Sequence, residues 1–294
     1  MTEKKKVVLV FGGSGFLGSH VAETLNEKGF KVIIADLKKH KGLSKNIKFE
    51  KVDINNKIKV DKIIKKVSIV YNFAAVADIQ DCYDNPIKSL NINIIGCANI
   101  LQSCVENKIK KFILASSIYA NTSQGGFYRV SKLACETMTM EYSKVYDLNY
   151  TILRYGSIYG PRANLKNGLH KIVHDSLKKK KLIYRGTKKA IRSFIHVKDA
   201  AKSSVEILNS KFKNKVVLIK GKKEITIVNL LLILKRILKI KSKLLFLNRT
   251  QMGHYDKKPR EIKKVKTIEY YTKMPQNFED SLHEIIDLIR EKKH

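Results

Sequence analysis

A glycine-rich turn between an apolar segment and an amphipathic one most constrains the fold of this chain. The stretch reads VVLVFGGSGFLGSHVAETL and lies near the N-terminus, with Gly12, Gly15 and Gly18 three residues apart. The first glycine permits a tight turn, the second lets a pyrophosphate approach the backbone, and the third lets a helix pack closely on a strand. Because the N–H groups of such a helix face the phosphates, the turn predicts a dinucleotide site that includes Phe16 and Leu17.

An aspartate at the end of the next apolar segment indicates which dinucleotide binds. Asp36 stands 18 residues beyond Gly18, where a carboxylate accepts hydrogen bonds from both ribose hydroxyls of an adenosine and repels a 2′-phosphate. The sequence therefore favours NAD(H) as the cofactor. An aspartate that only closes the turn after the strand is the alternative, and Lys38 and Lys39 leave some tolerance of NADP(H) open.

Two further strand ends carry candidate cofactor contacts. Asp53, which Ile54 follows, comes after a third apolar segment and could meet the adenine amino group or cap a turn. Ala74 and Ala75 follow a fourth segment, where small side chains would let a flat cofactor lie against the backbone or let a helix pack tightly. We predict that these four residues line the cofactor site.

Short, nearly continuous apolar segments alternate with longer amphipathic ones along the first half of the chain. Such segments are typical of buried parallel strands. Their alternation with helices predicts an α/β fold with a Rossmann-like, doubly wound parallel sheet. The five segments are 7–11, 31–35, 68–73, 111–115 and 150–154.

The regular alternation of strand-like and helical segments ends after residue 155. Beyond it, lysine-rich helical stretches mix with isolated strands such as 216–219. We therefore expect an NAD-binding Rossmann domain over 1–155 and a smaller C-terminal α/β domain that binds substrate over 156–294. The stretch 191–208 is expected to return to the first domain.

A tyrosine and a lysine stand four residues apart, just after a strand-like segment that ends in two serines. Tyr128 and Lys132 share one face of the expected helix, and the strand end delivers Ser116 and Ser117. Ligands of doubly wound sheets bind at the carboxyl ends of the strands, so these side chains should meet the cofactor there. A phenol is ordinarily a poor base, and a lysine cation beside it favours the ionised form. The set predicts removal of a proton from an alcohol as hydride leaves.

The charge of the chain is strongly positive, with 59 basic against 26 acidic residues and a formal net charge of +33. A polyanionic partner would explain such a charge. Only nine of the basic residues are arginine, however, and the lysines are spread along the whole chain. This pattern favours a compositional origin, and we do not expect nucleic-acid binding.

The remaining composition indicates a cytoplasmic protein. The four cysteines lack the spacing of metal ligands or of a redox motif, so we expect reduced thiols and no metal site. No apolar run reaches the roughly 18 residues of a membrane span, and the N-terminus shows no export signal.

Together these motifs resemble the extended short-chain dehydrogenase/reductase family, in particular its nucleotide-sugar epimerases and dehydratases. The likeness covers nearly the whole chain: GGSGFLGSH resembles the family's glycine loop, NINIIGCANIL its asparagine segment, and LRYGSIYGPR and IRSFIHVKD two substrate segments. It implies that Ser117, Tyr128 and Lys132 form the catalytic triad and that Asn93 is a structural residue of the cofactor site. The substrate contacts it implies are Ser116, Ser117, Ser157, Arg162, Arg192 and Arg260.

Departures from the family pattern narrow the reaction. Ile118 and Tyr119 follow the triad serine, where family dehydratases and decarboxylases carry an acidic residue. The resemblance then implies an NAD-dependent epimerase of a nucleotide-diphosphate sugar, with a UDP-sugar as the expected substrate, in the synthesis of cell-surface polysaccharide precursors. The alternatives are a nucleotide-sugar 4-keto reductase or dehydrogenase, and a catalytically idle basic relative that binds RNA or membrane.

Relatives pair two helices into a dimer interface, and the corresponding stretches 88–107 and 128–147 carry apolar residues on more than one face. Such helices need burial on two sides, so a homodimer is expected. The residues concerned are Ile92, Ile95, Leu101, Val105, Leu133, Met138, Met140 and Tyr142.

Overall fold

The computed structural model describes residues 6–248, 253–254 and 265–291. Its centre is one parallel sheet of eight strands in the order β14-β11-β6-β5-β4-β1-β2-β3. The strands are β1 (Val7–Phe11), β2 (Lys31–Asp36), β3 (Lys48–Lys51), β4 (Ile69–Asn72), β5 (Lys111–Ser117), β6 (Tyr150–Tyr155), β11 (Lys215–Ile219) and β14 (Thr267–Tyr270). The strand order reverses between β1 and β4, which confirms the predicted doubly wound α/β fold and places its ligand crevice at that point.

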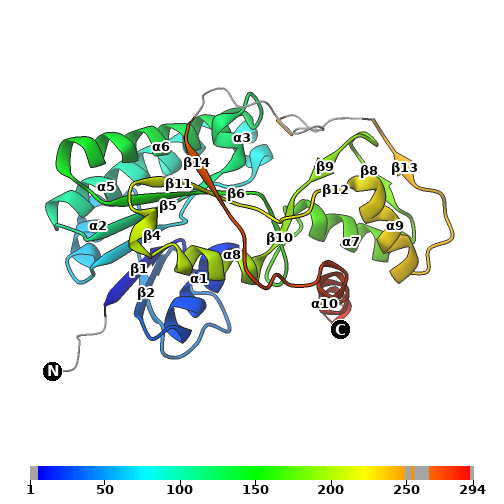
Figure 1. Ribbon diagram of the computed structural model, residues 1–294, viewed down its shortest axis with the longest axis horizontal. Coiled ribbons are helices and arrows are strands. Elements are labelled where there is room, and N and C mark those ends of the chain that lie inside the picture. The colour runs from blue at the N-terminus through cyan, green and yellow to red at the C-terminus, as the bar shows by residue number, and fades with distance from the viewer. Residues whose placement is uncertain (1–5, 249–252, 255–264, 292–294) are drawn as a thin grey trace.

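Helices cover both faces of the sheet (Figure 1). One face carries α1 (Phe16–Glu27) and α8 (Val197–Glu206), and the other carries α2 (Lys57–Ile64), α5 (Gly96–Glu106) and α6 (Gly126–Tyr146). Each face has its own buried apolar cluster, because alternate residues of a strand point to opposite faces. Val8 and Val10 pack with α1 and α8, whereas Leu9 and Phe11 pack with α2 and α5.

The expected position of segment 216–219 in the C-terminal domain is wrong. This segment is most of β11, which pairs in parallel with β6 on one side and with β14 on the other. Its apolar run suits a strand covered on both faces, since Val217 and Ile219 join one core cluster and Val216 joins the other. Within 191–208, α8 packs against α1, whereas the two short strands of this stretch pair outside the large sheet.

The C-terminal region beside the carboxyl ends of the strands contains helices α7 (Gly168–Lys179), α9 (Ile227–Ile237) and α10 (Phe278–Glu291) (Figure 1). They enclose a third core cluster that includes Leu177, Leu230 and Ile285. Three two-stranded ribbons lie outside the large sheet. They pair β7 (Ser157–Tyr159) with β10 (Phe194–His196), β9 (Ile191–Arg192) with β12 (Ile225–Thr226), and β8 (Ile183–Tyr184) with β13 (Leu245–Phe246).

Short helical turns connect several of these elements. They are α3 (Ile79–Asp84), α4 (Pro86–Leu90), a π-helical turn over Asn91–Ile95, and 3₁₀ turns over Ile118–Asn121 and Ser210–Phe212. Among the described residues, no helix is both long and apolar enough to cross a bilayer.

Candidate active site

The glycine turn leaves no room for side chains. Gly12 has φ +70°, and a Cβ there would lie 2.6 Å from Ala74 N; a Cβ on Gly18 would lie 2.3 Å from Gly12 O. Gly15 is the N-cap of α1, whose first turn holds no acidic residue and, within the described chain, no side-chain cap. The N–H groups of this turn are therefore open to an anion, as a dinucleotide pyrophosphate requires. Phe16 begins the helix, and Leu17 packs against the core.

Asp36 is fixed against the glycine turn. Its Oδ2 accepts a hydrogen bond from Ser14 N at 3.0 Å, and its Oδ1 accepts one from Leu37 N at 2.7 Å. The carboxylate therefore lies at the end of β2 beside the start of α1, where the adenosine ribose of a dinucleotide would lie. A ribose contact by Asp36 remains a prediction that this placement allows.

Asp53 and Ile54 hold the turn after β3. Asp53 Oδ1 accepts from Asn55 N at 2.9 Å, so the turn-capping alternative is observed. Ile54 is buried, its carbonyl accepts from Asn99 Nδ2 at 3.0 Å, and its side chain fills the space beside Gly96. The structure thus directs the side chain of Ile54 into the core, and cofactor contacts at this turn stay a prediction.

Asn93 ties the loop after β4 to helix α6. Its amide exchanges two hydrogen bonds with the backbone of Val76, at 2.7 and 3.0 Å, and donates to Ser131 Oγ at 2.9 Å. Ser131 in turn donates to Tyr128 O at 2.8 Å. The loop that contains Ala74 and Ala75 is therefore fixed relative to Tyr128, a structural role of the kind predicted for Asn93.

The structure brings Ser117, Tyr128 and Lys132 to one edge of the sheet. Ser117 ends β5, while Tyr128 and Lys132 lie one turn apart on α6. Lys132 is buried, its Nζ donates to Ala115 O at 3.0 Å, and the same Nζ lies 5.8 Å from the centre of the Tyr128 ring. Ser117 Oγ accepts from Tyr119 N at 3.3 Å, so its own proton is available to a ligand oxygen.

The prediction that Ser116 binds substrate is wrong. Its hydroxyl points away from the cavity and donates to Glu136 Oε1 at 2.5 Å. Glu136 also accepts two hydrogen bonds from Arg154, at 2.9 and 2.6 Å, and all three side chains are buried. Neighbouring strand residues face opposite sides, so only Ser117 of the pair reaches the cavity, which it lines together with Tyr128.

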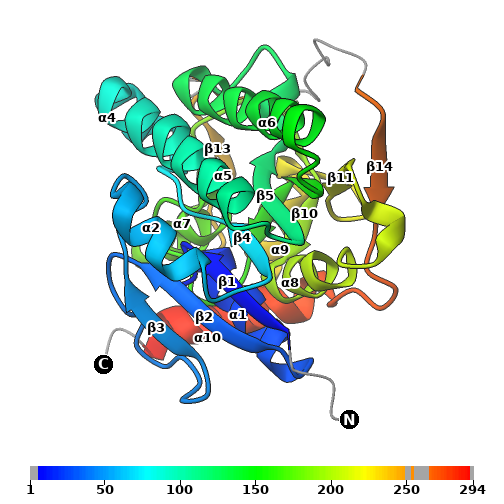
Figure 2. The same ribbon diagram turned by 90° about the vertical axis from the view of Figure 1, so that its left-hand side faces the viewer.

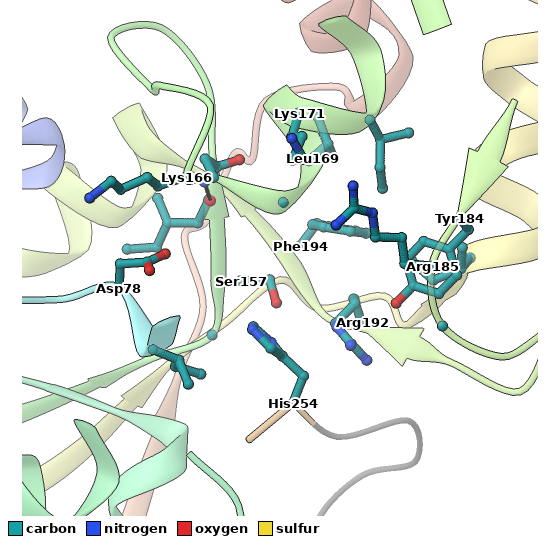
Figure 3. A pocket seen from close by; sticks show the side chains of 18 of the residues that line it. Asp78, Ser157, Lys166, Leu169, Lys171, Tyr184, Arg185, Arg192, Phe194 and His254 are labelled. Atoms are coloured by element: carbon teal, nitrogen blue, oxygen red, sulfur yellow. Dashed lines mark hydrogen bonds between the residues drawn. The ribbon is translucent and has the colours of Figure 1, made fainter. Parts of the chain in front are cut away.

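A cavity of about 480 Å³ is lined by Ser117 and Tyr128 and by residues of α7 and β8. Figure 3 shows part of its lining, including Ser157, Lys171 and Tyr184. Two predicted substrate residues, Ser157 and Arg192, line it. Arg162 does not line it, and that prediction is wrong: its guanidinium binds Ser19 Oγ at 3.1 Å and Glu23 Oε1 at 2.8 Å on α1. Arg260 lies outside the described residues.

Cations gather along the cavity wall that α7, β8 and β9 form. Sequence reasoning missed most of them, because lysines abound throughout the chain and no local pattern distinguishes these. The basic residues that line the cavity are Lys166, Lys171, Lys179, Lys181, Arg185, Arg192 and His254. Among the described residues, the acidic side chains that line it are Asp78 and Asp175, so these residues give the cavity an excess of positive charge that suits a polyanionic ligand.

His254 also lines the cavity, where its ring lies near Ser157 and Arg192 (Figure 3). Its Nδ1 is 3.4 Å from the Tyr119 hydroxyl, and the Tyr119 ring packs edge-on against Tyr128. Burial, and secondarily the charge of Arg192, lowers the pKa of His254. The imidazole is therefore neutral at neutral pH. No sequence motif indicated this residue.

Among the described residues, no three His, Cys, Asp or Glu side chains converge as metal ligands would. The expected absence of a metal remains a prediction. The four cysteines are free and buried.

A glycine turn at the strand-order reversal, with a serine, a tyrosine and a lysine at the neighbouring strand end, defines an enzyme of the extended short-chain dehydrogenase/reductase type. The chain belongs to the NAD dependent epimerase/dehydratase family, whose sequence model matches residues 8–219. The resemblance seen in the sequence is thereby confirmed, and NAD is the cofactor of this family.

Individual relatives share the fold over nearly the whole chain. A Methanocaldococcus jannaschii protein named "Putative UDP-glucose 4-epimerase" is 32% identical over 250 residues, which cover 78% of this chain and 81% of that protein. The Thermotoga maritima UDP-glucose 4-epimerase structure with UDP-glucose has a TM-score of 0.81 and 25% identity, and covers 98% of this chain and 100% of its own. A Bacillus cereus UDP-glucuronic acid 4-epimerase with UDP-glucuronic acid and NAD has a TM-score of 0.83 at 22% identity, covering 97% and 99%.

Proposed function

We propose that the chain is an NAD-dependent epimerase that inverts C4 of the sugar of a UDP-sugar through a transient ketone. The observation that carries this proposal is the cavity, which joins the Ser117, Tyr128 and Lys132 group to a cation-lined wall. One end can handle a sugar hydroxyl, and the other can hold a nucleoside diphosphate. The names of the relatives support the same substrate class.

The residues of the glycine turn, together with Asp36, would hold the cofactor. When bound, NAD⁺ supplies the hydride acceptor beside the sugar carbon. Tyr128 takes the hydroxyl proton and later returns it to the inverted oxygen. Lys132 places its charge beside the phenol, 5.8 Å from the centre of the Tyr128 ring, and its bond to Ala115 O fixes its position. Ser117 has its proton free to donate to the sugar oxygen, because its lone pair already accepts from Tyr119 N.

The far end of the cavity suits the nucleotide. Arg192 offers a planar fork that matches phosphate oxygens, and Arg185, Lys179 and Lys181 stand beyond it. Tyr184 and the apolar side chains of Ile227 and Leu247 line the same region and would pack against the faces of a nucleobase.

The side chains around Ser117 favour epimerisation over dehydration or decarboxylation. Ile118 and Tyr119 follow it and line the cavity without offering a carboxylate. Of the cavity carboxylates, Asp175 faces Lys171 at 3.8 Å and Asp78 caps α3 by accepting from Asp81 N at 3.0 Å.

The direct test combines cofactor retention with turnover. We expect the purified protein to carry NAD in native mass spectrometry and to convert a UDP-hexose into its C4 epimer without added cofactor. Tyr128→Phe should keep the NAD and lose at least about a hundredfold in turnover, the usual scale for a positioned acid/base. Tyr146→Phe, an exposed tyrosine on the same helix, is the matched control. Near-normal turnover of Tyr128→Phe would refute the assignment.

A further inference from the structure

Among the residues that the structure describes, the end of the cavity at Ser117 and Tyr128 carries fewer available cations than the end at α7 and β8. The described residues that line the cavity together with Ser117 and Tyr128 include the 77–79 loop, Tyr119 and His254. The carboxylate of Asp78 stands in this wall (Figure 3). Its Oδ1 caps α3, which fixes the side chain where a sugar held by Ser117 would pass.

The nearby basic groups have other roles. The ammonium of Lys166 is paired with the carboxylate of Asp81. His254 is neutral at neutral pH, because burial and the charge of Arg192 lower its pKa. Arg192 itself is the group assigned above to the diphosphate. Lys132, beside Tyr128, donates to Ala115 O and is assigned above to the phenol. Among the described residues, the sugar end thus adds a carboxylate, a neutral imidazole, a phenol and a hydroxyl.

From this arrangement we propose that the sugar of the substrate is an uncharged hexose, and that Asp78 excludes uronic acids. The inference rests on the proposed function. Hydroxyl or amide groups of a neutral sugar can donate to Asp78, and such charge-assisted hydrogen bonds are strong. A uronate carboxylate would enter beside a like charge and would need a cation of its own, because an unpaired charge in a closed site is costly. The preference sets the chain apart from the B. cereus structure, which holds UDP-glucuronic acid.

The experiment compares UDP-glucose, UDP-N-acetylglucosamine and UDP-glucuronate as substrates of the NAD-loaded full chain. Epimer formation is followed by NMR and binding by calorimetry. We expect kcat/KM for the better neutral sugar to exceed that for UDP-glucuronate at least tenfold. Asp78→Asn should narrow this ratio at least tenfold, since asparagine remains a good N-cap but carries no charge. The exposed Asp84→Asn on the same helix is the control and should leave the ratio unchanged.

The outcomes separate the two proposals. If UDP-glucuronate is converted as well as or better than both neutral sugars, the inference is overturned and the epimerase assignment stands. If Asp78→Asn folds, as its melting temperature reports, and leaves the ratio of the wild-type chain unchanged, Asp78 is not the selecting group and the inference is likewise overturned. If no UDP-sugar binds or is converted, the proposed function itself fails.

Discussion

Ser116 Oγ lies 2.5 Å from Glu136 Oε1, which ties the end of β5 to α6, the helix that carries Tyr128. One turn earlier on that helix, Lys132 Nζ donates to Ala115 O at 3.0 Å. Two successive residues of β5 are thus bound to α6, and Ser117 comes next in the strand. A buried ion pair between Glu136 and Arg154 completes the junction, so the position of Ser117 relative to Tyr128 and Lys132 depends on it.

The first prediction follows from this junction. Glu136→Ala should lower the free energy of unfolding by about 3–5 kcal/mol, because it leaves the buried Arg154 charge without its partner. Urea denaturation measures the effect. Glu141→Ala, an exposed glutamate on the same helix, should change stability by less than about 0.5 kcal/mol. Similar small losses for both variants would show that the ion pair does not hold the junction.

The second prediction concerns cofactor choice. Asp36→Asn keeps an oxygen that can accept from Ser14 N but removes the charge that repels a 2′-phosphate. The ratio of NADP(H) to NAD(H) affinity should therefore rise at least tenfold in titrations with both cofactors. The wild-type chain should bind NAD(H) more tightly. Tighter NADP(H) binding by the wild type would mean that Lys38 and Lys39 override the carboxylate.

The third prediction concerns assembly. Of the residues on which the expected dimer rested, Leu101 is fully buried within the chain, whereas Ile95 is half exposed. Val130 and Val145 of α6 are also exposed, and α4, α5 and α6 lie side by side on one face (Figure 2). We expect a homodimer through this face, with a mass of twice 33.7 kDa by light scattering.

Substitution tests which face is used. Ile95→Lys combined with Val145→Lys should yield a monomer, because it places charge in an apolar contact. Ile58→Lys, which changes an exposed isoleucine on α2, should remain a dimer. A wild-type monomer at micromolar concentration would contradict the expectation.

The fourth prediction concerns pH. His196 is buried, its Nε2 lies 3.5 Å from Glu284 Oε2, and Lys198 and His20 are the other titratable groups near it. Burial lowers its pKa to about 4. Below about pH 6.5 the unfolded chain binds a proton that the folded chain does not bind until about pH 4. The contribution of His196 to the free energy of unfolding is therefore fully present above about pH 6.5, and it is lost as the pH falls towards 4.

Because of this histidine, lowering the pH from 7.5 to 5 should reduce the free energy of unfolding by about 2 kcal/mol. His196→Asn keeps an N-cap acceptor for Lys198 N, which His196 Nδ1 now serves at 3.4 Å, and cannot titrate. Urea melts at both pH values should show a smaller loss in the variant. An equal loss in both proteins would assign the pH dependence to other groups.

Local patterns were sufficient to predict the sheet, the glycine turn and the Tyr128–Lys132 pair, since each depends on spacing within one or two elements. Long-range contacts were not accessible in this way. Arg162 turns to Glu23 on α1, 139 residues earlier in the chain, and no local pattern indicates that partner. The apolar residues of β11 predict a strand, but they do not indicate that its neighbour in the sheet is β6. His254 was missed because its place in the cavity depends on tertiary structure alone.

The most direct test of the central claim follows the hydrogen on C4. A UDP-hexose deuterated at C4 is incubated with the purified chain, without added cofactor, and the product is analysed by NMR and mass spectrometry. The account predicts a C4 epimer that retains its deuterium, because the same hydrogen leaves and returns within one active site. Loss of deuterium from the product, or accumulation of reduced cofactor in place of an epimer, would contradict it.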